Sequence, residues 1–260
     1  MFRTLPLSLS LAGLDFAGDP RAGEVAPAEP RSLLHWAAAG PVRAVTLDGA
    51  MPGLRARELS RSARRDLGAT LRRVELTPAG LDLWIPPPHF VDPARQDRAI
   101  EAVLGAMELA ADLRALVGSG SALVTIELPT DLDAGVVRTL ASAADRAGAR
   151  LADAACPWRE PAPGGTIAPA LDPAAAILAG LDPVAEAGRL GATLAGARLS
   201  DLSPAGRVEP GSAGGRLDVA AYGAALAAGG YDGFVTLDLR RLREPTAAVE
   251  RVHDRWAATP

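Results

Sequence analysis

Acidic side chains follow short apolar runs at several places along this chain, in positions where they could act together. Asp48 follows the run at residues 44–47, for example, and Asp238 follows the run at residues 234–237. If such runs are parallel strands of one closed sheet, the acids that follow them gather at its carboxyl end. Carboxylates gathered there can bind a divalent metal ion or serve as general acid and base. The acids in question are Asp48, Glu127, Asp153, Asp172, Asp201 and Asp238.

Segments with strand-like and helix-like patterns alternate along the chain and would position these acids. Apolar residues recur at helical spacing after Asp92 and Pro93, which predicts a long helix beginning there. Ser60 is a candidate N-cap for a helix that ends at Arg73. A Gly/Pro-rich loop is expected at residues 203–215. Strands are expected at residues 7–11, 42–47, 81–85, 123–128, 150–153, 167–171, 197–199 and 234–237.

The number of these units predicts the fold. Eight β/α units in 260 residues give about 32 residues each, which suits a closed (β/α)₈ TIM barrel. Residues 1–260 would form this barrel as a single domain, with the Pro/Gly stretch at 161–165 as a loop. A doubly wound open sheet is the alternative, but no Gly-x-Gly-x-x-Gly motif follows an early strand. No nucleotide cofactor is therefore expected.

The composition excludes several kinds of protein. All 27 basic residues are arginine and none is lysine, which rules out Schiff-base, pyridoxal-phosphate and P-loop lysine chemistry. The net charge of −4 argues against a nucleic-acid partner. No apolar run reaches the roughly 18 residues that a membrane span needs, so no membrane partner is expected either. Cys156 is the single cysteine and cannot form an internal disulfide, which favours a cytoplasmic location.

Several short motifs occur in an order that resembles the xylose isomerase-like barrels grouped as sugar phosphate isomerases/epimerases. Residues 171–173 (Leu-Asp-Pro) resemble that family's Leu-Asp-Pro-Gly-His turn, and residues 198–201 stand where it has His-x-x-Asp. The segment 209–218 resembles its Pro-Gly-x-Gly-x-Leu-Asp loop, and 230–238 its Gly-Tyr-x-Gly…Glu ending. Together with looser agreement in the N-terminal half, the resemblance covers about residues 7–256.

The resemblance implies a metal site that this chain has in part. In the family, two glutamates, an aspartate and a histidine hold Mn²⁺, Mg²⁺ or Co²⁺, and the glutamates move a proton between sugar carbons. Asp172 matches the aspartate ligand, and Asp238 replaces the last glutamate as a metal ligand and catalytic residue. The first glutamate falls on Ala154, which leaves Asp153 beside it as the other catalytic candidate, although strand alternation points Asp153 to the opposite face. The histidine ligand falls on Arg198, which cannot coordinate a metal.

Two functions therefore remain open at the end of the sequence analysis. The first is a barrel that binds a sugar, polyol, sugar acid or protein partner without catalysis, with the Arg198 guanidinium in place of the cation. The second is a divalent-metal-dependent isomerase or epimerase of a small sugar or sugar phosphate. Both readings allow a homo-oligomer. The expected substrate-binding residues are His89, Arg198, Asp201 and Glu127.

Overall fold

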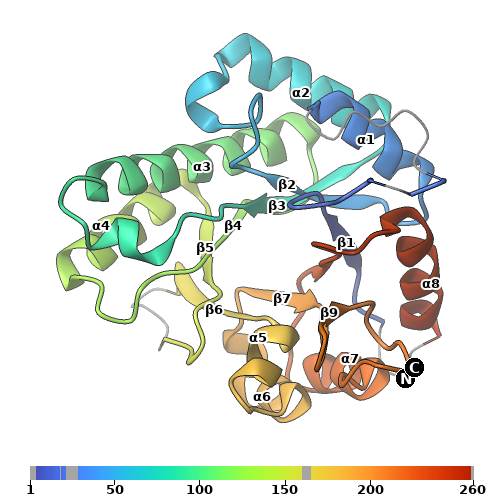
Figure 1. The fold of residues 1–260 in the computed structure, drawn as a ribbon. Helices are drawn as coiled ribbons and strands as arrows, with labels where there is room; N and C mark the ends of the chain where they lie inside the picture. Colours follow the sequence, from blue (N-terminus) through green and yellow to red (C-terminus); the bar gives the residue numbers. More distant parts are fainter. Residues whose placement is uncertain (1–3, 18, 22–28, 160–164, 259–260) are drawn as a thin grey trace.

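Eight parallel strands close into a barrel in the computed structural model, which describes residues 4–17, 19–21, 29–159 and 165–258 (Figure 1). The order around the barrel is β1-β10-β7-β6-β5-β4-β3-β2, so the predicted (β/α)₈ architecture is confirmed and the open sheet is excluded. The loop expected at residues 161–165 lies almost wholly outside the described residues. The barrel strands are β1 (Leu7–Ser10), β2 (Ala44–Asp48), β3 (Thr77–Asp82), β4 (Leu123–Ile126), β5 (Arg150–Asp153), β6 (Ile167–Leu171), β7 (Gly196–Leu199) and β10 (Val235–Leu237).

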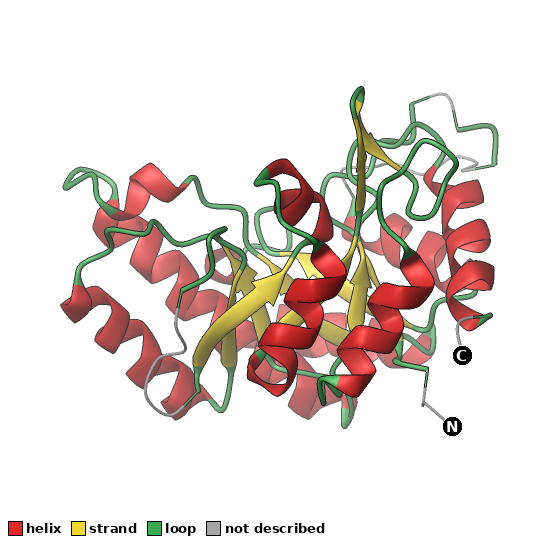
Figure 2. Ribbon diagram, turned by 90° about the horizontal axis from the view of Figure 1, so that it is seen from below, coloured by secondary structure: helices red, strands yellow, loops and turns green. Residues whose placement is uncertain are grey.

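Helices surround the barrel on its outside (Figure 2). Local capping explains where several of them begin: the Ser60 hydroxyl accepts a hydrogen bond from the Ala63 N–H at 3.2 Å, as predicted, and Asp133 accepts from Gly135 at 2.7 Å. No described helix is both long and apolar enough to cross a membrane. The α-helices are α1 (Pro30–Ala39), α2 (Arg61–Arg73), α3 (Gln96–Val117), α4 (Ala134–Ala147), α5 (Pro173–Leu178), α6 (Pro183–Leu190), α7 (Val219–Ala228) and α8 (Pro245–Ala257), and the 3₁₀ turns are η1 (Ala56–Glu58), η2 (Pro87–Phe90) and η3 (Gly191–Thr193).

The third strand lies earlier in the chain than predicted. The expected strand at residues 81–85 is wrong in its bounds, because β3 already begins at Thr77 and ends at Asp82. Pro78 and Gly80 are unusual inside a strand, so the sequence did not predict one there. Both belong to a bulge at which the register between β2 and β3 shifts by one residue. Gly80 has a φ of +153°, which few other residues adopt. The bulge places Asp82 at the carboxyl end of the barrel, opposite Asp48.

Two other boundaries differ from the sequence-based prediction. The long helix begins at Gln96 instead of at Asp92, because the Asp92 carboxylate accepts a hydrogen bond from Ala94 at 3.0 Å and forms a turn first. The segment at 203–215 is partly a hairpin of β8 (Asp201–Ser203) and β9 (Gly206–Val208) and not entirely a loop. This hairpin follows β7 and extends past the strand ends of the barrel (Figure 2).

The inside of the barrel is filled by small side chains. Ser8, Thr46 and Thr236 form one layer, with Ser8 Oγ 3.0 Å from Thr236 Oγ1 and 3.3 Å from Thr46 Oγ1. Small interior residues also lie on β5 and β7. A Cβ atom added to Gly196 of β7 would lie 3.3 Å from the Cβ of Ala152 on β5, although these two strands do not pair with each other. A barrel with such small interior residues leaves room for one long side chain to cross it.

Candidate functional site

That long side chain is Arg198, which crosses the barrel from β7 to β3. One guanidinium nitrogen donates to Asp82, and the other, Nη1, lies 3.1 Å from Asp238 Oδ2. The Ser10 hydroxyl donates to the second oxygen of Asp82 at 2.5 Å. Arg198 is only 2% exposed, and neither carboxylate side chain is exposed at all. A buried guanidinium therefore occupies the axis of the barrel at its carboxyl end.

Two further arginines lie above Arg198 and close the mouth. Arg207 on β9 reaches Asp238 Oδ2 at 3.2 Å and Asp172 Oδ2 at 3.1 Å. Arg240 binds Asp238 Oδ2 at 2.6 Å and lies 3.7 Å from Asp172 Oδ2. Their side chains are 24% and 19% exposed, so they form the surface of this site. We call the whole set the axial cluster: Asp82, Asp172, Asp238, Arg198, Arg207 and Arg240.

Trp84 forms one wall of the axial cluster. The guanidinium carbon of Arg240 lies 4.0 Å from the centre of the indole ring, and that of Arg198 lies 4.9 Å from it. Both distances are within the range of a cation–π contact. Within the described part of the chain, the buried N–H groups at Trp84 Nε1 and Arg198 Nε have no acceptor. The mouth thus combines an aromatic face with both donors and acceptors of hydrogen bonds.

Burial and ion pairing act against each other on the charges of this cluster. Burial alone would raise the pKa of Asp238, but Arg198 and Arg240 outweigh it and hold that pKa well below its usual range. Burial raises the pKa of Asp82, although Arg198 and Ser10 oppose the shift. Burial disfavours the charge on Arg198, yet Asp82 and Asp238 raise its pKa, so the guanidinium stays protonated.

The structure brings three of the predicted site residues together: Asp172, Arg198 and Asp238. Asp172 has a second role as N-cap of α5, since its Oδ1 accepts a hydrogen bond from Ala174 N at 3.0 Å. The Ser200 hydroxyl donates to the same oxygen. Asp172 therefore caps α5 and faces the mouth at the same time.

Asp153 and Asp201 are fully occupied by structural hydrogen bonds instead. Asp153 alternates with Ala152, an interior residue, and accordingly lies on the outward face of β5, as the alternation predicted. Its carboxylate accepts hydrogen bonds from the Leu128 and Ala155 N–H groups at 3.0 and 3.1 Å and from Arg159 Nε at 3.2 Å. Asp201 organises the loop after β9 by accepting from four backbone N–H groups, those of Leu202, Gly211, Arg216 and Leu217.

His89 and Glu127 contact none of the residues of the axial cluster. His89 is half-buried on η2, and its Nε2 lies 2.9 Å from Arg95 Nη1. Glu127 is exposed just after β4. Both remain candidates only for contacts at the rim.

The sequence analysis missed four residues of this site. Asp82 was hidden inside the misplaced third strand, and Trp84 follows it. Arg240 stands two residues after Asp238, a spacing that could have placed it on the same side of the chain. Arg207 comes into the mouth through the β8–β9 hairpin, for which the Gly/Pro-rich sequence carried no clear signal.

The residues of the mouth do not fit the metal site that the resemblance implied. Among the described residues, no group of three or more His, Cys, Asp or Glu side chains is arranged to hold a metal ion. The carboxylate oxygens of Asp172 and Asp238 that face the mouth are bound by arginines, and no histidine joins them. A guanidinium has only donors and repels a cation.

Comparison with known proteins gives the fold a context. No protein-family profile matches the chain, and no curated protein matches it in sequence. Among solved structures it is similar to a xylose isomerase-like TIM barrel protein from Mycobacterium smegmatis in complex with magnesium, with a TM-score of 0.68, 13% identity and coverage of 98% of this chain and 96% of the other.

Two further similar structures carry enzyme names. A sugar phosphate isomerase/epimerase from Parabacteroides distasonis aligns with a TM-score of 0.64 and 13% identity over 98% of this chain and 95% of its own. The probable 3-DHS dehydratase AsbF of Bacillus anthracis aligns with a TM-score of 0.64 and 10% identity over 98% of this chain and all of its own. At these identities the likeness establishes the fold, and the chemistry has to be argued from the site.

Proposed function

We propose that this chain, whose fold is that of the xylose isomerase-like barrels, binds a small sugar or polyol at its carboxyl end without a metal ion and without isomerising it. The observation that carries the proposal is Arg198, which lies buried between Asp82 and Asp238 on the barrel axis. The positive charge that the resemblance assigns to a metal ion is supplied here by a side chain of the protein.

The balance of charge in the axial cluster favours a neutral ligand. Its three arginines and three aspartates cancel formally, so the mouth offers no net attraction to a phosphate or a cation. A sugar hydroxyl both donates and accepts hydrogen bonds, and it can therefore bridge a carboxylate and a guanidinium. Arg207 and Arg240 are the partly exposed members that such a ligand would meet first.

Loss of the metal also removes the basis for isomerisation. A proton on carbon beside a carbonyl is only weakly acidic, and a cation normally stabilises the enediolate as a base removes that proton. At this mouth, Asp238 is held ionised by two arginines, and ion pairing makes its carboxylate a weaker base. Asp153, the other catalytic candidate, faces away from the barrel interior, which further supports binding without turnover.

A thermal-shift and calorimetric screen of EDTA-treated protein tests the proposal. We expect D-fructose, D-xylose or myo-inositol to raise Tm in the absence of metal, and we expect no added effect of Mn²⁺, Mg²⁺ or Co²⁺. Arg207→Gln should abolish the sugar-dependent shift, because it removes a partly exposed donor from the mouth. Arg216→Gln is the matched control, since Arg216 is an exposed arginine on the loop after β9.

Two outcomes would overturn the proposal. One is a panel in which no sugar or polyol shifts Tm without metal. The other is a metal-dependent shift lost in Asp172→Ala and accompanied by conversion of a ketose, which would establish the metal-dependent isomerase instead.

A further inference from the structure

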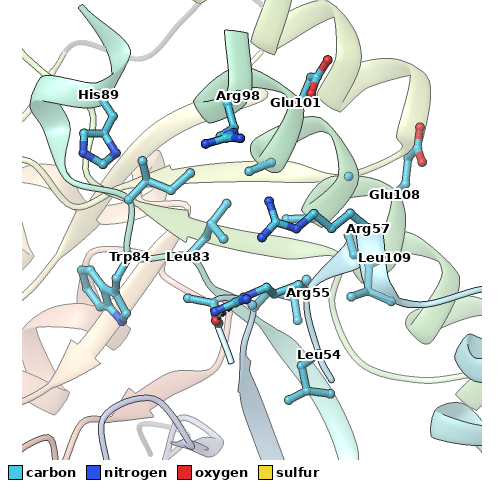
Figure 3. Close-up of a pocket in the computed structure, with 18 of the residues that line it drawn as sticks. Leu54, Arg55, Arg57, Leu83, Trp84, His89, Arg98, Glu101, Glu108 and Leu109 are labelled. Carbon is cyan, nitrogen blue, oxygen red and sulfur yellow. Dashed lines mark hydrogen bonds between the residues drawn. The ribbon is translucent and has the colours of Figure 1, made fainter. Parts of the chain in front are cut away.

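A second arginine-rich region lies beside the barrel mouth, and the proposed function does not use it. A cavity of about 600 Å³ opens between η1, the segment that follows β3, and the N-terminal half of α3 (Figure 3). This volume is within the range of small-molecule sites in proteins. Trp84, which also forms a wall of the axial cluster, and His89 line this cavity.

The floor of this side cavity is apolar. Leu81 precedes Asp82 in β3, and Leu83 follows it directly after the strand. Because neighbouring residues of a strand point to opposite faces, both leucines face outward from the barrel while Asp82 faces inward. Helix α3 contributes Ala106 and Leu109, which are 3% and 1% exposed. An apolar floor of this kind favours the apolar part of a ligand over a sugar ring.

Four arginines line this cavity, Arg55, Arg57, Arg64 and Arg98, and Arg64 is ion-paired with Asp112 at 2.6 Å. Figure 3 shows the guanidinium groups of Arg55, Arg57 and Arg98 directed toward its centre, whereas the carboxylates of Glu101 and Glu108 point away from them. Arg55 is bound to the Ala50 carbonyl and to Glu58. Arg57 and Arg98 are exposed, and neither forms a hydrogen bond or ion pair with another described residue.

The backbone brings these arginines together by a close approach of η1 to α3. A Cβ atom added to Gly105 of α3 would lie only 3.1 Å from the Cβ of Ala56, so glycine allows the contact. Ala56 stands between Arg55 and Arg57, and this contact therefore holds both arginines over the floor contributed by α3.

We infer that the side cavity binds a small organic acid with an apolar body, such as a medium-chain fatty acid. The guanidinium groups of Arg57 and Arg98 would pair with the carboxylate, for which arginine has matching geometry. The leucine and alanine side chains of the floor would cover the chain of the acid. Trp84 borders both sites, but Arg57 and Arg98 are not part of the axial cluster, so neither site needs the arginines of the other.

Calorimetric titration of the full chain with octanoate tests the inference, with 1-octanol as the uncharged probe of the same length. We expect octanoate to bind and to change the fluorescence of the protein, because Trp84 lines the cavity. Arg57→Gln/Arg98→Gln should weaken octanoate at least about tenfold, since two charge-assisted hydrogen bonds are lost. The matched control is Arg65→Gln/Arg73→Gln, which removes two exposed arginines of α2 from outside the cavity and should leave the affinity unchanged.

Three results would overturn the inference: no binding of octanoate, equal binding of 1-octanol, or equal losses in the cavity variant and its control. Sugar-dependent shifts in Tm are measured on the same cavity variant. They should persist there, so failure of this inference is distinguished from failure of the function proposed for the mouth.

Discussion

The axial cluster holds three arginines and the side cavity is lined by four, Arg55, Arg57, Arg64 and Arg98, and the two regions differ in how many of these are paired. At the mouth, Arg198 lies buried and meets two carboxylates, and every guanidinium of the cluster is paired. In the side cavity, Arg57 and Arg98 are exposed and have no ion pair with another described residue. Burial explains the difference, because a charge removed from water must be paired whereas an exposed one need not be. The buried pairs of Arg198 stabilise the protein, whereas Arg57 and Arg98 can meet a ligand without breaking an ion pair.

The largest effect should come from breaking the buried pairs. Arg198→Met keeps most of the side-chain volume but leaves Asp82 without its guanidinium partner and Asp238 with fewer partners. We expect the free energy of unfolding to fall by about 3–5 kcal/mol, measured by urea denaturation. Arg57→Met in the side cavity serves as control and should change it by less than about 0.5 kcal/mol. Equal losses in the two variants would mean that the distinction between the two regions is wrong.

A pH series sharpens the role of Asp238. Its pKa is lower in the folded protein than the ordinary value of 3.8, because Arg198 and Arg240 outweigh the effect of burial. The ion pairs of Asp238 therefore stabilise the fold above about pH 4, and this contribution is lost as the pH falls further. The pKa of Asp82 is raised, so Asp82 changes the dependence of stability on pH in the opposite direction. Asp82 is present both in the parent protein and in a variant of Asp238, so it does not distinguish the two.

Asp238→Asn isolates this contribution. We expect the variant to be less stable than the parent protein at pH 7, with the difference in unfolding free energy shrinking between about pH 4 and pH 2. Urea denaturation at each pH provides the measurement. A difference that stays constant across this range would show that Asp238 does not act through its charge.

The two regions also differ in how far the sequence predicted them. A signal carried by neighbouring residues was reliable at Ser60, which caps its helix where expected. Asp172, Arg198 and Asp238, which the sequence offered as site candidates, lie together at the mouth. Asp82 was missed because β3 contains a bulge with Pro78 and Gly80, two residues that argue against a strand. Arg207 was missed because a hairpin brings it into the mouth. The bulge depends on pairing between β2 and β3, which lie far apart in the chain, and a single sequence does not encode such pairing as a local pattern. The hairpin pairs neighbouring segments, but its Gly/Pro-rich sequence predicted a loop.

The side cavity could not have been predicted at all from the motifs. His89 was expected at a pocket, and it does line this cavity. Nothing in the sequence around Arg57 or Arg98, however, marks either residue as part of a site. Only the close contact of Gly105 with Ala56 across two elements gives them a common direction.

A smaller effect is expected at the surface of the axial cluster. Arg240→Gln removes the guanidinium that lies 4.0 Å from the Trp84 ring and its ion pair with Asp238. Because the side chain is 19% exposed and Arg198 and Arg207 still hold Asp238, we expect a loss of only about 1 kcal/mol. Tryptophan fluorescence should change in the same variant, and Arg216→Gln should leave both quantities unaltered. A loss as large as that of Arg198→Met would place Arg240 among the buried pairs.

The smallest effect on the free protein should come from Arg57→Gln/Arg98→Gln. Removing two exposed like charges from one cavity should leave the free energy of unfolding within about 0.5 kcal/mol of the parent, or raise it slightly. The contrast appears when octanoate is added, because a ligand that binds only the folded state raises the free energy of unfolding, and more so the further its concentration exceeds its Kd. The parent protein should gain Tm with octanoate and the variant should not. The buried Arg198 at the mouth is retained for stability, and Arg57 and Arg98 of the side cavity for binding, so a cavity variant that is destabilised without ligand would contradict this division.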